Sequence, residues 1–195
     1  MRLARMWLAA LAATALWAVP AAADVFTFST GNPDGKIAIA SRPQNGAKFE
    51  IEAADDFVTT TPNTVINHAT FTGIVTGSNP TIGNVVVEIY RVFPKDSNVS
   101  RTSGPPTFST SQVPTRVNSP SDVELDSRSI AAGSLVLRTT TLGTFTAMNS
   151  VQPGGIHPSP GQTTGGNGSI TGTEVLFDVT FTTPFNLLPD HYFFV

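Results

Sequence analysis

The sequence of 195 residues contains no cysteine. It therefore forms no disulfide, offers no thiolate nucleophile and provides no cysteine ligand for zinc or an iron–sulfur cluster. Charge is also scarce, at 13% of residues, and the 11 Lys and Arg residues form no cluster. Because phosphate binding needs clustered basic side chains, this composition argues against a nucleic-acid partner. Tryptophan is limited to Trp7 and Trp17, near the N-terminus.

The first 23 residues have the pattern of an export signal. Arg2 and Arg5 precede an apolar run from Met6 to Val19, and the small residues Ala21–Ala23 follow. The alternative is a membrane anchor, but the run is shorter than the ~20 residues that span a bilayer. We therefore predict cleavage before Asp24 and a location in the periplasm, on the cell surface or outside the cell.

Residues 24–195 are predicted to form one domain made of strands. Apolar residues alternate with polar ones, and no window of 11 or more residues has the 3.6-residue period of a helix. The clearest alternation runs from Glu174 to Thr182, with Val175, Phe177, Val179 and Phe181 facing inward. Val85–Phe93 is nearly continuously apolar, which is typical of a central strand covered on both faces. The other predicted strands are Val25–Ser29, Lys36–Ala40, Lys48–Glu52, Phe57–Thr60, Val65–Thr76, Ser134–Thr140 and Thr144–Met148.

This pattern predicts an all-β fold, namely a two-layer antiparallel β-sandwich of jelly-roll type. Asn32–Gly35 has the residue types of a tight turn and is predicted to close a hairpin between the first two strands. Pro94–Ser121 and Gln152–Gly168 are rich in Pro, Gly, Ser and Thr and are predicted to be long loops.

The chain stops in an apolar segment, His191–Val195, that is predicted to be a strand. A strand of this kind at the end of a chain would leave an adhesive edge for other chains. We therefore expect the sequence to be a fragment that lacks further C-terminal strands of the sandwich.

Several segments together resemble a known group of proteins. They are Ala54–Val58, Val87–Pro94, Ser103–Thr110, Arg116–Asp122 and Leu188–Phe194. In these segments the chain resembles exported bacterial β-sandwich proteins, many of which carry a PEP-CTERM sorting tail. The resemblance implies an envelope-exported protein of Gram-negative bacteria, often linked to surface or exopolysaccharide material, with no established catalytic activity. The Pro-Glu-Pro motif, membrane helix and basic tail of that group are absent from this sequence.

Asp55 and Asp56, with Asp34 brought near in the fold, are the best candidates for a metal site. Calcium binds clustered carboxylate and carbonyl oxygens that loops supply, although no D-x-[DN]-x-[DN]-G loop accompanies these residues. In the alternative interpretation, one aspartate accepts hydrogen bonds from backbone amides at the start of a strand and the other faces water. No other cofactor is predicted.

Two sets of acidic residues have a spacing that overlaps the carboxylate separations of glycosidases. Glu50 and Glu52 share one strand face, as do Asp122, Glu124 and Asp126 if their segment is extended. A general acid needs an apolar pocket that raises its pKa. Because alternation turns these groups outward, we interpret them as solvated strand faces.

The three histidines, His68, His157 and His191, are scattered and lack the spacing of a metal site. Alternation predicts that His68 faces solvent, and His191 lies at the start of a strand. No G-x-S-x-G nucleophile motif occurs. We therefore predict no catalytic residues.

These observations predict a non-enzymatic exported protein of the envelope or extracellular matrix, with an interaction or structural role and with extracellular polysaccharide or other surface components as partners. A carbohydrate-binding module, with or without calcium, is the first alternative. The only tyrosines, Tyr90 and Tyr192, lie in apolar strands, which weighs against a sugar-stacking platform. A secreted hydrolase is the second alternative.

Overall fold

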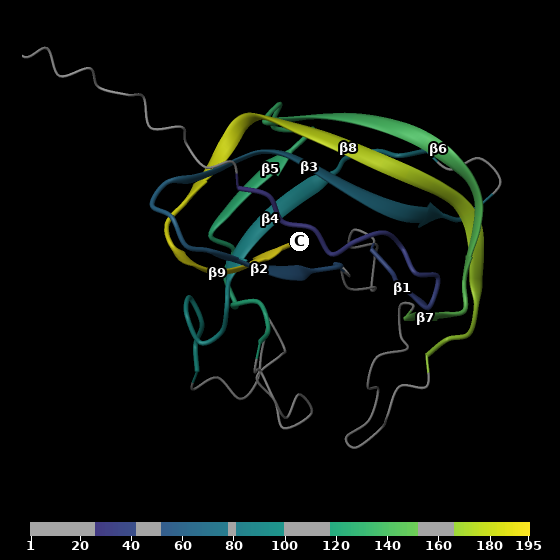
Figure 1. The fold of residues 1–195 in the computed structure, drawn as a ribbon, viewed down its shortest axis with the longest axis horizontal. Coiled ribbons are helices and arrows are strands. Elements are labelled where there is room, and N and C mark those ends of the chain that lie inside the picture. The colour runs from purple at the N-terminus through teal and green to yellow at the C-terminus, as the bar shows by residue number, and fades with distance from the viewer. Residues whose placement is uncertain (1–25, 42–51, 78–80, 100–117, 152–165) are drawn as a thin grey trace, which may run out of the picture.

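The computed structural model of the chain describes residues 26–41, 52–77, 81–99, 118–151 and 166–195. These ranges contain nine strands and no helix (Figure 1). Hence no helix in them is long and apolar enough to cross a membrane. The strands are β1 (Ile37–Ile39), β2 (Asp55–Thr59), β3 (Thr64–Val75), β4 (Val86–Arg91), β5 (Asp126–Ser129), β6 (Leu135–Ala147), β7 (Asn149–Val151), β8 (Ile170–Leu187) and β9 (Asp190–Phe194).

The strands form two antiparallel sheets and one small parallel pair. The four-stranded sheet has the order β2-β9-β4-β5, and the three-stranded sheet has the order β3-β8-β6. The parallel pair consists of β1 and β7. The two antiparallel sheets pack against each other, which confirms the predicted all-β, two-layer antiparallel fold.

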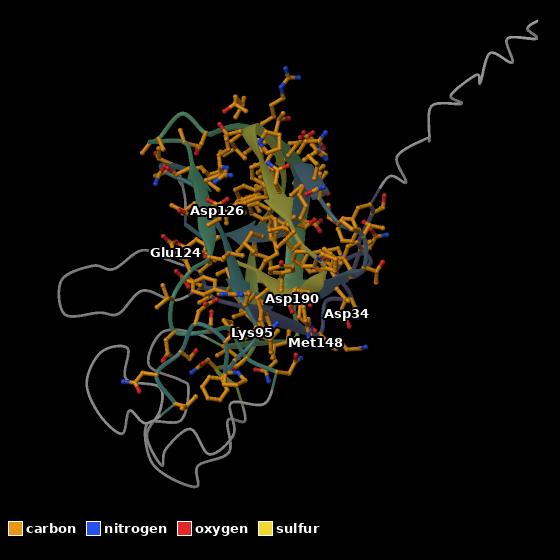
Figure 2. All side chains as sticks on the ribbon, turned by 90° about the vertical axis from the view of Figure 1, so that its left-hand side faces the viewer. Asp34, Lys95, Glu124, Asp126, Met148 and Asp190 are labelled. Carbon is orange, nitrogen blue, oxygen red and sulfur yellow. The ribbon has the colours of Figure 1, made fainter. Side chains whose placement is uncertain are left out.

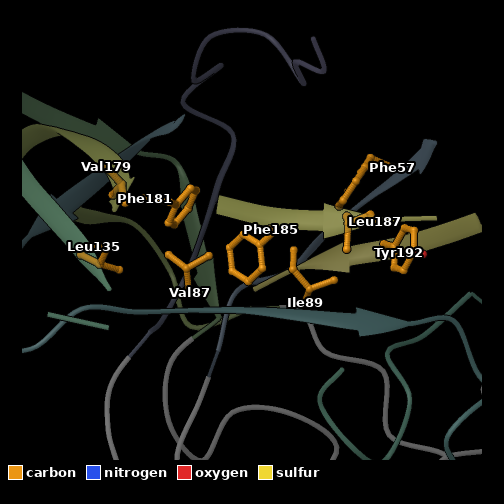
Figure 3. Close-up of a cluster of buried hydrophobic side chains, with 9 residues drawn as sticks. All are labelled: Phe57, Val87, Ile89, Leu135, Val179, Phe181, Phe185, Leu187 and Tyr192. Carbon is orange, nitrogen blue, oxygen red and sulfur yellow. The ribbon is translucent and has the colours of Figure 1, made fainter. Parts of the chain in front are cut away.

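The core lies between the two larger sheets (Figure 3). The predicted inward alternation of β8 is confirmed, because Val175, Phe177, Val179 and Phe181 are all buried. Nine buried side chains form one cluster: Phe57, Val87, Ile89 and Tyr192 from the four-stranded sheet, and Leu135, Val179, Phe181, Phe185 and Leu187 from the other side. Large aromatic rings therefore supply much of the apolar area that holds the layers together.

Arg128 of β5 ties the two sheets together at an irregular point of β8. The register of β3 and β8 shifts there: Ile66 pairs with Phe185 but His68 pairs with Thr180. Four residues of β8, 181–184, therefore lie between two pairs that are separated by only Asn67 on β3. Arg128 Nε donates to the Thr183 carbonyl (2.6 Å) and Nη2 to that of Pro184 (3.1 Å). The guanidinium also lies over the Phe185 ring, 4.3 Å from its centroid. The irregularity accommodates a proline, which has no N–H for a ladder.

One end of the three-stranded sheet extends past the four-stranded sheet, to the right in Figure 1. We call this end the overhang; it consists of residues 72–75 of β3, 140–147 of β6 and 170–176 of β8. None of its side chains belongs to the core cluster, and residues 140–144 of β6 are all exposed. A β-bulge between Thr141 and Gly143 interrupts β6, and Gly143 has a φ of 132°, which a residue with a Cβ rarely adopts.

Two turn and strand predictions near the N-terminus are wrong. Residues 26–30 form no strand, and β1 pairs with β7 rather than with a preceding strand, so Asn32–Gly35 closes no hairpin. The local turn chemistry is nevertheless present. Asp34 Oδ1 accepts the Lys36 N–H (2.9 Å), and Gly35 has a φ of 71°. Local residue types therefore predicted the turn correctly but not the partner strand of β1.

Two further strand predictions need correction. The segments Ser134–Thr140 and Thr144–Met148 are one strand, β6, joined across the bulge. Strand β4 is central, as predicted, but only one of its faces is fully buried: Val87 and Ile89 point into the core, whereas Val86 is exposed. The predicted strand Lys48–Glu52 lies outside the described residues except for Glu52, which is not in a strand.

The apolar C-terminal segment is a strand, as predicted, but it is not an open edge. Strand β9 lies between β2 and β4 and pairs with both. The argument for missing strands from an adhesive edge at His191–Val195 therefore fails. Of the two predicted long loops, residues 100–117 and 152–165 lie outside the described ranges. The short parts that are described are not wholly without structure, since Val92 and Pro120 form a β-bridge.

Candidate functional site

The outer face of the four-stranded sheet carries an aspartate–histidine pair. Phe57 and Tyr192 point into the core, so alternation places their neighbours Asp56 and His191 on the opposite face. His191 Nε2 lies 2.6 Å from Asp56 Oδ2, and the two side chains are 35% and 37% exposed. The pair joins β2 to β9 at a position that water reaches.

The surroundings of this pair favour the ionised carboxylate. The hydrogen bond from His191 lowers the pKa of Asp56 below its usual value, and the Asn118 side chain contributes in the same direction. The His191 ring stacks on Phe193, with ring centroids 6.3 Å apart and planes at 16°. Asp56 is thus a hydrogen-bond acceptor held in place by groups from two other segments of the chain, β9 and the segment of Asn118.

A second polar group lies two strands away on the same face. The Tyr90 hydroxyl of β4 donates to Glu88 Oε2 (2.6 Å). Burial and the neighbouring Glu88 carboxylate raise the pKa of Tyr90, which keeps the phenol protonated. Burial also raises the pKa of Glu124, just before β5, and the nearby Glu88 acts in the same direction. Glu88 and Glu124 therefore form a pair of carboxyl groups that disfavours a double negative charge.

The two groups are joined by a row of residues across the sheet. Asp56 lies opposite Phe193, and Phe193 lies opposite Tyr90. Phe193 is only 6% exposed, so its ring offers no face for stacking on a sugar. Within the described ranges, no serine or threonine hydroxyl is hydrogen-bonded to His191. Among the described residues, the row therefore offers carboxylate, imidazole and phenol groups for binding, without a hydroxyl paired to His191 as in a Ser-His-Asp triad.

The three aspartates predicted to bind calcium do not form one group. Asp34 accepts the Lys36 amide and forms an ion pair with the Lys36 ammonium (3.0 Å). Asp55 accepts the N–H of Asp56 (2.9 Å), and successive residues of a strand point to opposite faces. Nowhere in the described ranges do three His, Asp or Glu side chains gather as a metal site. The geometry gives the calcium prediction no support, and it stays a prediction.

The alternative interpretation of the two adjacent aspartates holds in part. Asp55 accepts a backbone amide, as that interpretation predicted for one of them. Asp56 does not simply face water, because His191 binds it. The backbone amide of Lys36 is the main cause of the lowered pKa of Asp34, which is the signature of a turn-stabilising aspartate.

The other carboxylates predicted to share strand faces are also dispersed. Asp122 and Glu124 precede β5 and are not in a strand, so the predicted common face of Asp122, Glu124 and Asp126 does not exist. Asp122 accepts the Asn98 N–H (3.0 Å), and Asp126 binds Arg128 (2.9 Å). Figure 2 shows Asp34 on the other side of the molecule from Glu124 and Asp126. Glu50 lies outside the described residues, and Glu52 is exposed.

The predicted positions of the two histidines that lie in the described residues, His68 and His191, are confirmed. His68 is exposed and pairs with Asp178 across β3 and β8 (2.9 Å), and His191 is the second residue of β9. His157 lies outside the described residues. The aspartate partners could not be predicted from local patterns, because they are 110 and 135 residues away along the chain. Only the pairing of the strands brings each pair together.

Two shallow grooves border β6, with volumes of about 430 Å³ and 240 Å³. Aliphatic and threonine side chains line them, among them Ile82, Leu137 and Thr139. No carboxylate or histidine lines either groove, so they provide no setting for a general acid. Comparison of the chain with family models, curated proteins and solved structures finds no match.

Proposed function

We propose that this chain is a non-enzymatic exported protein of the bacterial envelope or extracellular matrix, with an interaction or structural role. The observation that carries the proposal is the distribution of ionisable side chains. Among the described residues, several occur as pairs on the outer faces of the sheets, such as His68 with Asp178 and Asp56 with His191. Glu88, Tyr90 and Glu124 form a small group, but it lies on a partly exposed sheet face. A catalytic site instead brings several such groups together in one enclosed pocket.

The outer face of the three-stranded sheet suits a hydrated, polymer-rich environment. Threonine hydroxyls surround the His68–Asp178 pair, since Thr70 lies opposite Asp178 and Thr180 opposite both His68 and Val136. Thr70, Thr140 and Thr180 are exposed. Hydroxyls both donate and accept hydrogen bonds, so this face can contact polysaccharide or other surface components without a deep site. The signal-like N-terminus and the resemblance to exported sandwich proteins support the same compartment.

Export and matrix association are tested together in a Gram-negative host. The full chain is expressed, the cells are fractionated, and the N-terminus of the recovered protein is sequenced. We expect protein that begins at Asp24 in the periplasm or medium and that co-sediments with extracellular polysaccharide. In a control variant, Leu8→Arg/Leu11→Arg, charge in the apolar run should leave an unprocessed chain inside the cell. Unprocessed wild-type protein in the cytoplasm would contradict the proposal.

A carbohydrate-binding module is the second candidate, and the row on the outer face of the four-stranded sheet favours it. Asp56, His191, Glu88 and Tyr90 place acceptors and donors along one partly exposed face. A glycan array with and without calcium tests this function. Binding that is lost in Asp56→Ala, and kept in Asp34→Ala in the turn before β1, would support it. Binding that neither substitution changes would place the sugar elsewhere.

A further inference from the structure

We propose that two copies of this chain associate through the free edge of β3, in antiparallel register, with a two-fold axis at Phe71. The result is one continuous sheet with the order β6-β8-β3-β3-β8-β6. This inference goes beyond the proposed function, because it requires neither export nor a polysaccharide. It names a second copy of the chain as a partner and identifies the strand that binds it.

The edge of β3 is available for such pairing. In the described part of the structure, β3 pairs only with β8. In an antiparallel strand every second residue directs its N–H and C=O away from the paired neighbour. No backbone hydrogen bond in that same part engages these groups between His68 and Val75. The chemistry that satisfies a row of alternating N–H and C=O groups is another extended backbone.

The edges of the other strands carry devices that discourage pairing, and β3 does not. Strand β2 begins with two aspartates, and β5 is short and carries Asp126 and Arg128. Strand β6 has Arg138 and the bulge at Gly143. By contrast, Ala69–Val75 has no charged residue, no proline and no register shift. Charges, bulges and short length are the usual protections of an edge, so β3 is the edge open to a partner.

Phe71 gives this edge an apolar centre. Its ring stacks on that of Phe177 in β8, with centroids 4.7 Å apart and planes at 6°. Phe71 is nevertheless 37% exposed, on a strand that has no neighbour on its other side in the described part of the structure. Across a two-fold axis at this position, the Phe71 rings of the two copies lie opposite each other. They extend the Phe71–Phe177 stack into the second copy. Each ring then buries apolar area that is exposed in a single copy.

The same register makes the rest of the edge self-complementary. Thr70 lies opposite Thr72 of the other copy, Ala69 opposite Gly73, and His68 opposite Ile74. Each of these pairs shares one face of the sheet, as strand pairing requires, because its members are an even number of residues apart. The two His68 side chains are about 20 Å apart, given ~3.4 Å per residue, so no like charges meet. A two-fold arrangement of this kind closes as a dimer.

Because the chain has no cysteine, introduced cysteines report the register directly. In Thr70→Cys/Thr72→Cys, which keeps Phe71, each cysteine faces its counterpart with Cα atoms about 4.5–5.5 Å apart, within disulfide range. In either single variant the Cα atoms of the two cysteines, one in each copy, are about 8 Å apart, beyond disulfide range. Under mild oxidation we expect the double variant to cross-link at least about tenfold more than either single variant. Equal cross-linking of all three would overturn the register.

Two lysine substitutions, compared with wild type by analytical sedimentation, test whether the edge of β3 is the one that pairs. Thr72→Lys keeps the Phe71 ring but places an ammonium on the proposed edge, and Val136→Lys places one on exposed β6 as a matched control. We expect dimers for wild type and Val136→Lys, and at least about tenfold weaker dimers for Thr72→Lys, which corresponds to ~1.4 kcal/mol. Wild-type protein that stays monomeric at every concentration would overturn the inference, as would dimers weakened by Val136→Lys instead. Either result leaves the export test unaffected.

Discussion

The two ends of β8 differ both in sequence pattern and in surroundings. From Val179 to Leu187 its inward side chains meet the four-stranded sheet, and Val179 and Phe185 are 0% exposed. From Ile170 to Leu176 the same strand lies in the overhang, where residues 140–144 of its neighbour β6 are all exposed and Val175 is the one residue of this part of β8 that is buried. Where the second layer covers β8, apolar residues occupy the inward positions of the alternation. In the overhang, Thr171 and Thr173 occupy the positions in phase with Val175, so the residue pattern follows the presence or absence of a covering sheet.

Removal of a ring should separate the two regions most strongly. Phe185→Ala empties a fully buried site between the sheets, and we expect it to lower the free energy of unfolding by about 3–5 kcal/mol. Phe71→Ala, beside the overhang, should cost only about 1 kcal/mol, because it removes one partly exposed stacked ring. Urea unfolding of both variants at low protein concentration measures the difference. Equal losses would mean that the overhang is as well covered as the core.

Loss of the Arg128 guanidinium should have the next largest effect on the free energy of unfolding. Arg128 is 10% exposed in its side chain and binds two carbonyls of β8. We expect Arg128→Met to cost about 2 kcal/mol, since it removes hydrogen bonds from a charged donor to two carbonyls and the contact of the guanidinium with the Phe185 ring. Arg138→Met on exposed β6 is the matched control and should change stability by less than about 0.5 kcal/mol. A neutral Arg128→Met would show that water replaces the lost hydrogen bonds.

A methyl group added to the overhang tests how tightly β3 and β8 approach there. A Cβ on Gly172 would lie 2.6 Å from the Val75 carbonyl oxygen, so the strands must shift. We expect Gly172→Ala to cost about 1 kcal/mol, at the low end for overpacking, because the overhang has room to move. Gly83→Ala meets nothing within 4 Å and serves as the control. Thermal unfolding compares the two variants. Unchanged stability in Gly172→Ala would indicate that β3 and β8 lie farther apart at the overhang than the 2.6 Å contact implies.

The smallest expected effect is a pH dependence on the outer face of the four-stranded sheet. The pKa of Asp56 lies below its usual value of 3.8, mainly because His191 donates a hydrogen bond to it. A carboxylate with a lowered pKa stabilises the fold above its unfolded pKa and loses that contribution as pH falls through the folded one. Asp56→Asn should therefore be less stable than wild type at pH 7, and the difference should vanish in acid.

Stability curves from pH 7 into acid check this expectation. His191→Leu removes the same hydrogen bond from the other strand, so it should reduce stability at pH 7 in the same direction. A difference between Asp56→Asn and wild type that persists unchanged in acid would mean that the pair acts through packing and not through charge.

Patterns of neighbouring residues predicted much of the fold. Glu174–Thr182 was correct in its inward face, because burial against a second sheet imposes a two-residue period that the sequence displays, but β8 extends beyond both ends of that segment, from Ile170 to Leu187. The predictions failed where the structure depends on distant pairing. Asn32–Gly35 forms the predicted turn, yet β1 pairs with β7, which lies more than a hundred residues later. A local motif carries no information about which strand will be adjacent.

The candidate site shows the same division. The sequence singles out Asp56 as a candidate for binding calcium, a backbone amide or water, but it does not reveal His191, which lies 2.6 Å from its carboxylate. The Glu88–Tyr90 pair lay within one predicted strand at a two-residue separation, so strand alternation alone places both on one face. Glu124 joins them only because β5 pairs with β4.

The position of β9 also orders the events of folding. Strands β2 and β4 have no direct ladder with each other, and β9 supplies the bonds between them. As a chain emerges N-terminus first, from a ribosome or through a pore, those two strands must wait for residues 190–194 before their sheet can assemble. The long separation of these partners favours slow, late closure, and until then the unfinished layer is the form most exposed to proteases.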